Sequence, residues 1–255
     1  MISESLATSS EPLDDGALEL SIVLPAYREA DNLRALLPRI LTVVESLRIL
    51  AEIVVVDADE ATDETPEICE SLEVCCLARK YGPNYGSAVR TGIAASRGGF
   101  IVIMDADGSH DPEFINELWR SRNDADIVIA SRYVKGGYTE NSVVLVACSR
   151  LLNTVFKLVL GLSASDVSNS FRLYHGDMLR NLQLCAEHFD IQEEILAKLQ
   201  WSANGGVCIK ELPFHFRRRI SGKSKRSMLV FLWAFLSSIY RLYYWKRHMN
   251  DPESD

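Results

Sequence analysis

Short apolar runs alternate with longer amphipathic stretches over residues 20–130. Several of these runs end abruptly at Pro or Asp, which is typical of buried strands. The expected strands are residues 20–24, 52–56, 74–77, 101–104 and 126–130. The expected helices are residues 28–50, where apolar residues recur at helical spacing, 66–72, 84–96 and a segment that begins at Pro112. This alternation predicts a mostly parallel, doubly wound α/β sheet.

Polar and charged residues follow four of the expected strands directly. They are Pro25, Tyr27 and Glu29; Asp57 and Asp59; Asp105 and Asp107; and Ser131, Arg132 and Tyr133. In an open α/β sheet, ligands bind in the crevice beyond the carboxyl ends of the strands. We therefore expect these residues to converge on one crevice.

The acidic pair Asp105 and Asp107 follows the apolar run 101–104, and Pro112 begins a new helix soon after. Two carboxylates on a loop can hold Mg²⁺ or Mn²⁺, because such an ion completes its shell with water and phosphate oxygens. The same two residues would also serve as ordinary turn and capping residues. The surrounding motifs have to decide between these interpretations.

The composition suits one α/β catalytic domain with an appendage: the chain has 255 residues, 47% of them hydrophobic and 24% charged. Residues 1–17 have few apolar positions and no signal-peptide pattern, so we expect a disordered start and a catalytic part that stays in the cytoplasm. The six cysteines form no metal-type C-x-x-C pair, and we expect buried, reduced thiols.

A basic block near the C-terminus stands against the net charge of −8. Ten Lys and Arg residues lie within 210–247, where Glu211 is the one acid. Within this block, residues 228–245 are almost entirely apolar and aromatic, which favours a membrane surface over nucleic acid. We expect a membrane-associated helix over 227–248, shallow in the interface, followed by an acidic tail at 249–255. A short transmembrane span and a core helix are the alternatives.

The strand-end motifs resemble glycosyltransferase family 2. Residues 21–29 are similar to the opening strand of that family, the acidic loop after residue 56 to its nucleotide-binding loop, and Asp105-Ala106-Asp107 to its metal motif. The subgroup of dolichol-phosphate and polyprenol-phosphate mannose synthases is similar over further segments, in the same order. These are residues 104–115, 131–137, Ser149-Arg150 with Asn153, 166–174, Gln192 with Glu194, and 216–225.

The resemblance covers about residues 20–226 and implies a GT-A fold for a catalytic domain over 18–226. It implies that a hexose, with mannose favoured, moves from a nucleoside-diphosphate sugar such as GDP-mannose to a polyprenyl or dolichyl monophosphate. It also implies a Mg²⁺ or Mn²⁺ cofactor, a membrane surface as partner, no nucleic acid, and a place on the cytoplasmic face of a membrane.

The same resemblance assigns roles to individual residues. Donor binding falls to Pro25, Tyr27, Glu29, Asp57, Asp59, Asp105 and Asp107, and the metal to Asp105 and Asp107. The acceptor phosphate falls to Arg132, Arg219, Ser224 and Lys225, and catalysis to Asp107, Arg132, Arg219 and Lys225. A phosphate acceptor arrives ionised near neutral pH, so cations matter more to it than a general base.

Several positions depart from the family pattern and keep other functions open. In the acidic loop after residue 56, the acids are spaced apart, whereas the family usually has two adjacent acids. Ser170 occupies a position where the family has glycine, Lys223 a position where an acid is expected, and Val144-Leu145 a position where an Arg is expected. A transferase with a hydroxyl acceptor would need a base, for which Asp166, Glu193 and Glu194 are the candidates. A degenerate protein that binds nucleotide sugar without turnover is the other alternative.

Overall fold

The computed structural model describes residues 17–202, 206–217 and 228–248, with the backbone alone at 228–236 and 248. Residues 1–16 of the expected disordered start, the site residues Arg219, Ser224 and Lys225, and the expected tail 249–255 lie outside the described residues.

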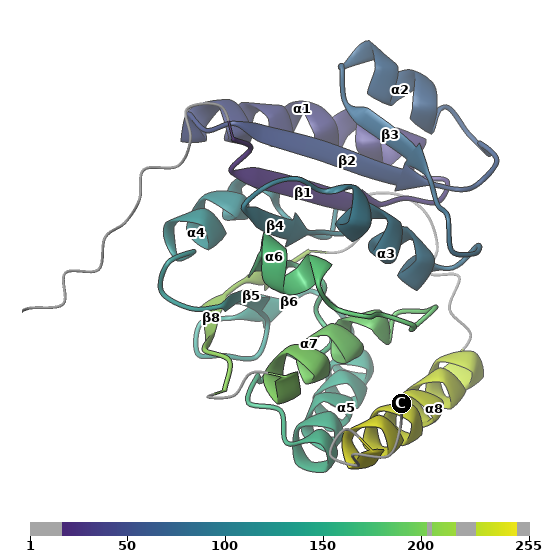
Figure 1. The fold of residues 1–255 in the computed structure, drawn as a ribbon, viewed down its shortest axis with the longest axis vertical. Helices are drawn as coiled ribbons and strands as arrows, with labels where there is room; N and C mark the ends of the chain where they lie inside the picture. The colour runs from purple at the N-terminus through teal and green to yellow at the C-terminus, as the bar shows by residue number, and fades with distance from the viewer. Residues whose placement is uncertain (1–16, 203–205, 218–227, 249–255) are drawn as a thin grey trace, which may run out of the picture.

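A seven-stranded sheet forms the centre of the molecule (Figure 1). Its order is β3 (Cys75–Ala78), β2 (Ala51–Asp57), β1 (Leu20–Pro25), β4 (Phe100–Ile103), β7 (Arg172–His175), β5 (Ile127–Ser131) and β8 (Ile209–Pro213). Every pairing is parallel except those of β7, which runs antiparallel between β4 and β5. The expectation of a mostly parallel sheet is confirmed, and β7 and β8 are the strands of this sheet that the alternating pattern did not predict.

A second, two-stranded sheet pairs β6 (Tyr138–Thr139) with β9 (His215–Phe216). The helices are α1 (Ala30–Leu47), α2 (Thr65–Ser71), α3 (Tyr85–Ala95), α4 (Ile115–Arg120), α5 (Val143–Leu160), α6 (Gly176–Arg180), α7 (Ile191–Ser202) and α8 (Met228–His248), with a 3₁₀ turn η1 (Pro112–Phe114) before α4. Each helix expected within residues 28–120 is present, with its ends shifted by a few residues.

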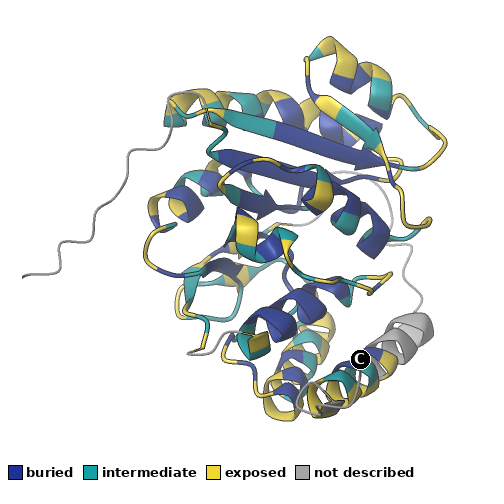
Figure 2. Cartoon of the chain, in the orientation of Figure 1, coloured by how far each residue is buried: buried dark blue, intermediate teal, exposed yellow. Residues whose placement is uncertain are grey.

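Two apolar layers cover the sheet, one on each face. Leu20, Ile22 and Leu24 of β1 pack with α1 and α4, whereas Val23 packs with α3 and α7. This division follows from the strand period of two residues, which sends successive side chains to opposite faces. β1 is buried along its whole length, and Figure 2 shows the buried residues concentrated in the central strands.

Helix α5 is the apolar surface helix that the sequence analysis did not single out. It is long and apolar enough to cross a membrane by length and composition, with a mean hydropathy of 1.9 and only 17% of its residues buried. The sequence pattern predicted such a helix at 227–248 alone.

Helix α8 packs against α5 and α7 through the described residues of its second half. Arg241 forms an ion pair with Asp190 (2.6 Å), and Trp245 stacks on Trp201 with ring centroids 5.8 Å apart. Leu242 is buried in the same cluster as α7. This end of α8 is therefore docked on the catalytic domain.

All six cysteines are free thiols, but the expectation that they are buried is wrong for most of them. Cys69 is buried and Cys76 is half-buried, whereas the others are exposed, namely Cys75, Cys148, Cys185 and Cys208. An apolar neighbourhood in the sequence did not guarantee burial: Cys75 begins β3, Cys148 lies on the exposed side of α5, and Cys185 and Cys208 lie in loops.

Candidate active site

The loop that carries the two acids begins where β4 ends. Asp105 is half-buried and Asp107 is buried, with 6% of its surface exposed. The backbone N–H and the hydroxyl of Ser109 both donate to Oδ1 of Asp107, at 3.0 and 2.5 Å. Gly108 turns the chain between them with φ +78°, a conformation that favours glycine. The turn therefore holds Asp107 in a defined orientation.

A buried histidine holds the backbone of Asp105, the first acid of this loop. The backbone N–H of Asp105 donates to Nδ1 of His110 at 2.9 Å, and Nε2 of His110 lies 3.2 Å from Oδ1 of Asn169. Because Nδ1 accepts the N–H of Asp105, the ring proton lies on Nε2, which donates to Asn169. Burial lowers the pKa of His110. The ring also stacks on Phe171 with centroids 4.9 Å apart.

The side chain of Asp105 accepts two hydrogen bonds on the same oxygen. Tyr85 donates its hydroxyl to Oδ1 at 2.8 Å, and Ser170 donates to it at 2.9 Å. Ser170 stands where the resemblance leads one to expect glycine, so this departure supplies a hydrogen-bond donor. Tyr85 was not among the predicted residues; the signal for it was its position at the start of the expected helix 84–96.

A cavity of about 620 Å³ opens at the carboxyl ends of β2 and β3. Its lining residues are Tyr27, Ala58, Asp59, Leu77, Ala78, Arg79, Lys80, Gly82 and Pro83. Two predicted donor residues, Tyr27 and Asp59, are therefore brought together. Arg79 and Lys80 were missed, although they follow the expected strand 74–77 as the predicted residues follow theirs.

Of the other predicted donor residues, Asp105 and Asp107 lie on the acidic loop, and Pro25, Glu29 and Asp57 are not in the lining of this cavity. Pro25 is the last residue of β1 and is buried. Glu29 accepts a hydrogen bond from Nδ2 of Asn32 at 2.6 Å. Asp57 is buried at the end of β2, and burial raises the pKa of its carboxyl group.

Arg79 joins three chain segments around the cavity. Its guanidinium donates to the carbonyl oxygens of Ala26 (2.6 Å), Asp57 (2.9 Å) and Pro83 (2.7 Å). It also lies over the ring of Tyr27, 5.7 Å from the centroid. Burial lowers the pKa of Arg79, although Asp57 opposes the effect. Arg79 thus holds the ends of β1 and β2 and the loop after β3 in fixed relation.

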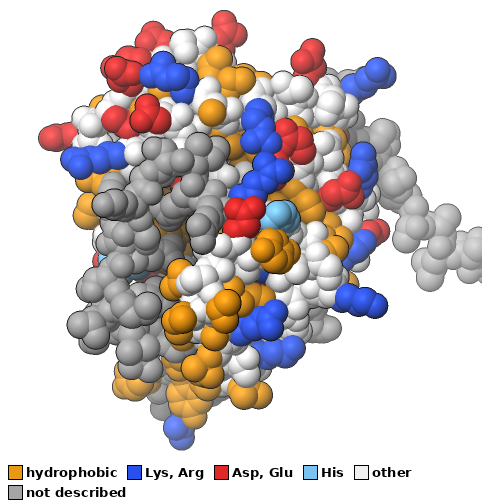
Figure 3. Space-filling view, turned by 180° about the vertical axis from the view of Figure 1, so that it is seen from behind, with side chains coloured by type: hydrophobic (Ala, Val, Ile, Leu, Met, Phe, Trp, Pro, Cys, Tyr) orange, Lys and Arg blue, Asp and Glu red, His pale blue; other side chains and the backbone are white. Residues whose placement is uncertain are grey.

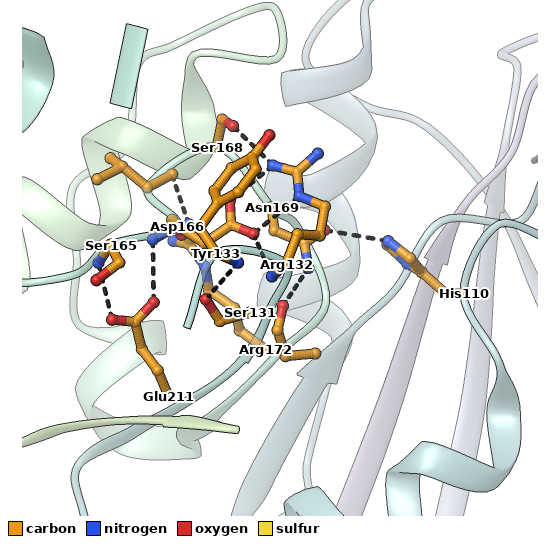
Figure 4. A network of polar contacts seen from close by, with 12 residues as sticks. His110, Ser131, Arg132, Tyr133, Ser165, Asp166, Ser168, Asn169, Arg172 and Glu211 are labelled. Atoms are coloured by element: carbon orange, nitrogen blue, oxygen red, sulfur yellow. Dashed lines mark hydrogen bonds and ion pairs between the residues drawn. The ribbon is translucent and has the colours of Figure 1, made fainter. Parts of the chain in front are cut away.

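Arg132 does not stand as an open cation at the end of β5, because it forms a buried ion pair with Asp166. Nε and Nη2 of Arg132 donate to the two carboxylate oxygens at 2.8 and 2.6 Å, and the arginine side chain is 10% exposed. Burial alone would lower the pKa of Arg132, but the attraction of Asp166 raises it overall. Figure 4 shows this pair with Ser168 and Asn169 beside it.

The segment 165–170 is held by two further charged residues (Figure 4). Glu211 accepts the backbone N–H groups of Ser165 and Asp166 at 2.8 and 3.0 Å. Arg172 is fully buried and donates to the carbonyl oxygens of Asp166 and Val167 at 3.2 and 2.5 Å. These contacts fix the segment whose Asn169 and Ser170 support the acidic loop.

Glu194 is fully buried beside a cation of its own helix. It forms an ion pair with Lys198 at 2.8 Å and accepts the backbone N–H of Ala186 at 2.7 Å. Burial alone would raise the pKa of Glu194, but the hydrogen bonds from Cys185 and Lys198 lower it overall. This carboxylate therefore acts as an anchor for the segment before α7.

Two further cations lie near the site: Arg217 is beside the acidic loop, and Arg150 is near Arg132. Arg217 donates its backbone N–H to the carbonyl of Ser109 at 3.1 Å and pairs with Asp111 at 2.5 Å. Arg150 of α5 lies over the ring of Tyr133, 5.4 Å from the centroid, and Arg132 lies 5.0 Å from the same centroid. The basic segment that contains Arg219 and Lys225 thus begins beside the loop of Asp107.

Residues 21–182 match the family described as Glycosyl transferase family 2. The match covers more than half of the chain, and the chain belongs to this family. The expectation of a glycosyltransferase is thereby confirmed.

Three curated relatives are similar over most of the chain. Dolichol-phosphate mannosyltransferase of Pyrococcus furiosus is 33% identical over 90% of this chain. The protein of the same name in Saccharomyces cerevisiae is 28% identical, over 92% of this chain and 91% of its own. Polyprenol monophosphomannose synthase of Mycolicibacterium smegmatis is 31% identical, over 81% of this chain and 80% of its own. The chain spans 65% of the length of the Pyrococcus relative.

Solved structures of glucosyl-3-phosphoglycerate synthase from Mycobacterium tuberculosis share the fold. The complex with Mn²⁺, uridine diphosphate and phosphoglyceric acid has a TM-score of 0.68 and 18% identity, over 89% of this chain and 79% of that one. The complex with Mg²⁺ and uridine diphosphate has a TM-score of 0.65, with 18% identity, over 91% and 79%. The predicted GT-A fold is confirmed.

The carboxylates of Asp105 and Asp107 suit a hard divalent cation, because such ions prefer oxygen ligands. Among the described residues, no group of three or more His, Cys, Asp and Glu side chains is placed to hold a metal ion. A cation at this loop would therefore take further ligands from a substrate diphosphate and water. The residues fit an ion that binds together with its substrate.

Proposed function

We propose that this glycosyltransferase moves mannose from GDP-mannose to a polyprenyl or dolichyl monophosphate, with Mg²⁺ or Mn²⁺, at the cytoplasmic surface of a membrane. The names of three relatives support the sugar and the lipid, and the cavity and the acidic loop support a nucleotide donor. The new bond joins the anomeric carbon to a phosphate oxygen, while the bond to the diphosphate breaks and GDP leaves with the electron pair.

The donor nucleoside lies in the cavity at the ends of β2 and β3. Tyr27 supplies an aromatic face, and Asp59 supplies acceptors for N–H and hydroxyl groups of the base and ribose, while the buried Asp57 holds the end of β2 next to them. Pro25 and Glu29 shape the end of β1, and Arg79 fixes the loops around the cavity. The altered spacing of the acids in this loop leaves Asp57 buried and Asp59 exposed in the lining.

Asp105 and Asp107 hold the divalent ion and face the donor diphosphate. A bound ion supplies positive charge beside the leaving group. Both carboxylates are oriented by two donors on one oxygen, Asp107 by Ser109 and Asp105 by Tyr85 and Ser170. We expect the loss of Asp107 to reduce turnover strongly, because it removes a main electrostatic group beside the leaving diphosphate.

One observation supports a phosphate as the acceptor: two of the carboxylates that could act as a general base are engaged in buried ion pairs. Asp166 pairs with Arg132, and Glu194 pairs with Lys198. A hydroxyl acceptor needs a carboxylate that can take up its proton, whereas a lipid phosphate arrives ionised and needs cations.

Cations for the phosphate come from the basic segment and from β5. Arg217 lies against Ser109 and Asp111, and Arg219 follows it in the sequence by two residues. Arg219, Ser224 and Lys225 bring net positive charge and a hydroxyl donor. Because Asp166 neutralises Arg132, Arg132 contributes hydrogen-bond donors to the acceptor and little net charge.

The membrane contacts α5 as well as α8. Large apolar side chains of α5 are exposed, namely Val143, Val144, Leu145, Leu151, Leu158 and Val159. The helix contains Arg150 and Lys157 and no acidic residue, and Figure 3 shows hydrophobic and basic side chains together at this lower end of the molecule. Apolar and basic groups together favour an anionic lipid surface, such as the cytoplasmic leaflet.

A substrate panel tests the proposal. The full chain is incubated with GDP-mannose, GDP-glucose or UDP-glucose, each with dolichyl phosphate, a bacterial polyprenyl phosphate or free polyprenol, in Mn²⁺ or Mg²⁺. We expect mannolipid and free GDP from GDP-mannose with a lipid phosphate. Equal use of free polyprenol would contradict the phosphate acceptor, and preference for another nucleotide sugar would contradict the donor.

A further inference from the structure

Tyr85, the first residue of α3, contacts the acidic loop through its side chain. Its hydroxyl donates to Oδ1 of Asp105 at 2.8 Å. Its ring stacks on Phe189, with centroids 4.2 Å apart and an interplanar angle of 20°. Nε2 of Gln192 lies 3.4 Å from the same hydroxyl. The hydroxyl and the ring of Tyr85 thus have different partners.

The segment that carries Phe189 is pressed closely against the start of α3. The backbone N–H of Gly86 donates to the carbonyl of Glu187 at 2.7 Å. A Cβ atom at Gly86 would lie 2.3 Å from the carbonyl oxygen of Ala186, closer than real Cβ atoms approach. Because Glu194 also binds the N–H of Ala186, this segment is anchored on both α3 and α7.

Two hydroxyl groups therefore meet on one oxygen of Asp105. Ser170 approaches from the segment fixed by Arg172 and Glu211, and Tyr85 approaches from α3. Hydrogen bonds from two rigid elements restrict the rotation of the carboxylate about its side-chain torsions. A carboxylate that is already oriented loses less conformational entropy when it binds an ion.

We propose that Tyr85 is a positioning residue for Asp105, and through it for the divalent ion and the donor diphosphate. The inference rests on the proposed function, because it takes Asp105 to face the metal and the nucleotide. The contribution of Tyr85 lies in its hydroxyl, whereas its ring serves the packing against Phe189. The two parts can be separated by substitution.

Tyr85→Phe tests the role of the hydroxyl, since it keeps the ring. We expect the affinity for Mn²⁺ in the presence of GDP, measured by electron paramagnetic resonance, to fall about tenfold, equivalent to about 1.4 kcal/mol. Binding of GDP without metal, measured by calorimetry, should stay the same. Tyr243→Phe is the control, because it removes the hydroxyl of an exposed tyrosine on α8 and should leave Mn²⁺ affinity unchanged.

Ser170→Ala and the double variant extend the test. If both hydroxyls orient one carboxylate, the loss of Mn²⁺ binding free energy in the double variant should exceed the sum of the losses in the two single variants. In turnover with the lipid acceptor, Tyr85→Phe should lower kcat and leave the KM of the acceptor unchanged. Phe189→Leu should weaken Mn²⁺ binding in the same direction but to a smaller degree.

Unchanged Mn²⁺ affinity in Tyr85→Phe would overturn the inference, and so would an equal loss of metal-free GDP binding, which a merely structural role predicts. Failure of the proposed function is distinguishable. It would appear as absence of mannolipid in the wild-type chain, whereas the comparison of Mn²⁺ binding can be repeated with any nucleoside diphosphate that the wild type binds.

Discussion

At the scale of single residues, the site is held by buried polar groups whose partners come from distant segments. His110 binds the backbone of Asp105 and the side chain of Asn169. Arg79 donates to three carbonyl groups, at the ends of β1 and β2 and in the loop after β3. Such groups are costly to bury unless they are hydrogen-bonded, so each of them specifies one arrangement of the loops around it.

Asp107→Ala should reduce turnover at least a hundredfold, roughly 3 kcal/mol of transition-state stabilisation, because it removes a main electrostatic group of the site. The rate is measured at saturating GDP-mannose, lipid phosphate and Mn²⁺. Asp31→Ala, which removes an exposed carboxylate of α1, is the control and should keep the wild-type rate. A rate for Asp107→Ala near that of the wild type would show that the acidic loop is not the metal site.

Arg79→Lys should destabilise the protein by about 2 kcal/mol, because one ammonium group cannot reproduce the fork that reaches three carbonyls. The free energy of unfolding is measured with urea. GDP binding should weaken as well, since the loops around the cavity lose their common anchor. Arg122→Lys, at a half-buried arginine that packs on Trp119, is the matched control and should change stability less.

At the scale of elements, α7 connects the site to the helices outside the sheet. Its Glu194 anchors the segment 185–190, which contacts α3, and its Trp201 stacks on Trp245 of α8. Asp190, immediately before α7, pairs with Arg241 of α8. The docking of α8 and the support of Tyr85 therefore depend on the same short segment.

Glu194→Gln should destabilise the fold at pH 7 by about 3 kcal/mol, because it leaves Lys198 buried without its ionic partner. The pKa of Glu194 is lowered in the folded protein from its ordinary value of 4.5, so the unfolded chain takes up the proton first as the pH falls. The stabilisation by Glu194 is complete above pH 4.5 and is lost below it.

The difference in unfolding free energy between Glu194→Gln and the wild type should therefore shrink below pH 4.5. Urea unfolding at several pH values measures it. Glu117→Gln breaks an exposed pair with Arg120 and should change stability by less than about 1 kcal/mol at any pH. A difference for Glu194→Gln that is independent of pH would show that the charge of Glu194 is not the stabilising feature.

At the scale of the whole molecule, the candidate active site lies next to the apolar helix α5. Arg150 of α5 reaches Tyr133 beside Arg132, while the outer side of α5 exposes Leu151 and Leu158. A lipid that lies in a membrane beneath α5 would therefore need only a short path to bring its phosphate to the basic residues.

Replacing Leu151 and Leu158 together by Ser should weaken binding to vesicles of phosphatidylcholine and phosphatidylserine at least tenfold, because each buried Leu contributes about 1.5 kcal/mol or more. Sedimentation with vesicles measures the binding. Leu50→Ser is the control, since Leu50 is 51% exposed in the turn before β2. Unaltered vesicle binding in the double variant would place the membrane contact on another surface.

The strands and helices up to residue 130 could be predicted from the sequence, because the periods of their apolar residues are local properties of the chain. The position of Asp105 and Asp107 at the end of β4 followed from the same pattern. The family motifs predicted the class of enzyme, the fold and the gathering of Tyr27 and Asp59 at one edge of the sheet.

Only the tertiary structure decided how these parts meet. The insertion of β7 between β4 and β5, the pairing of Arg132 with Asp166 and the contact of Tyr85 with Asp105 join residues far apart in the sequence. The exposure of α5 and the docking of α8 depend in the same way on which faces the neighbouring elements cover. No local period contains this information, because long-range partners are selected by packing and by the need to satisfy buried polar groups.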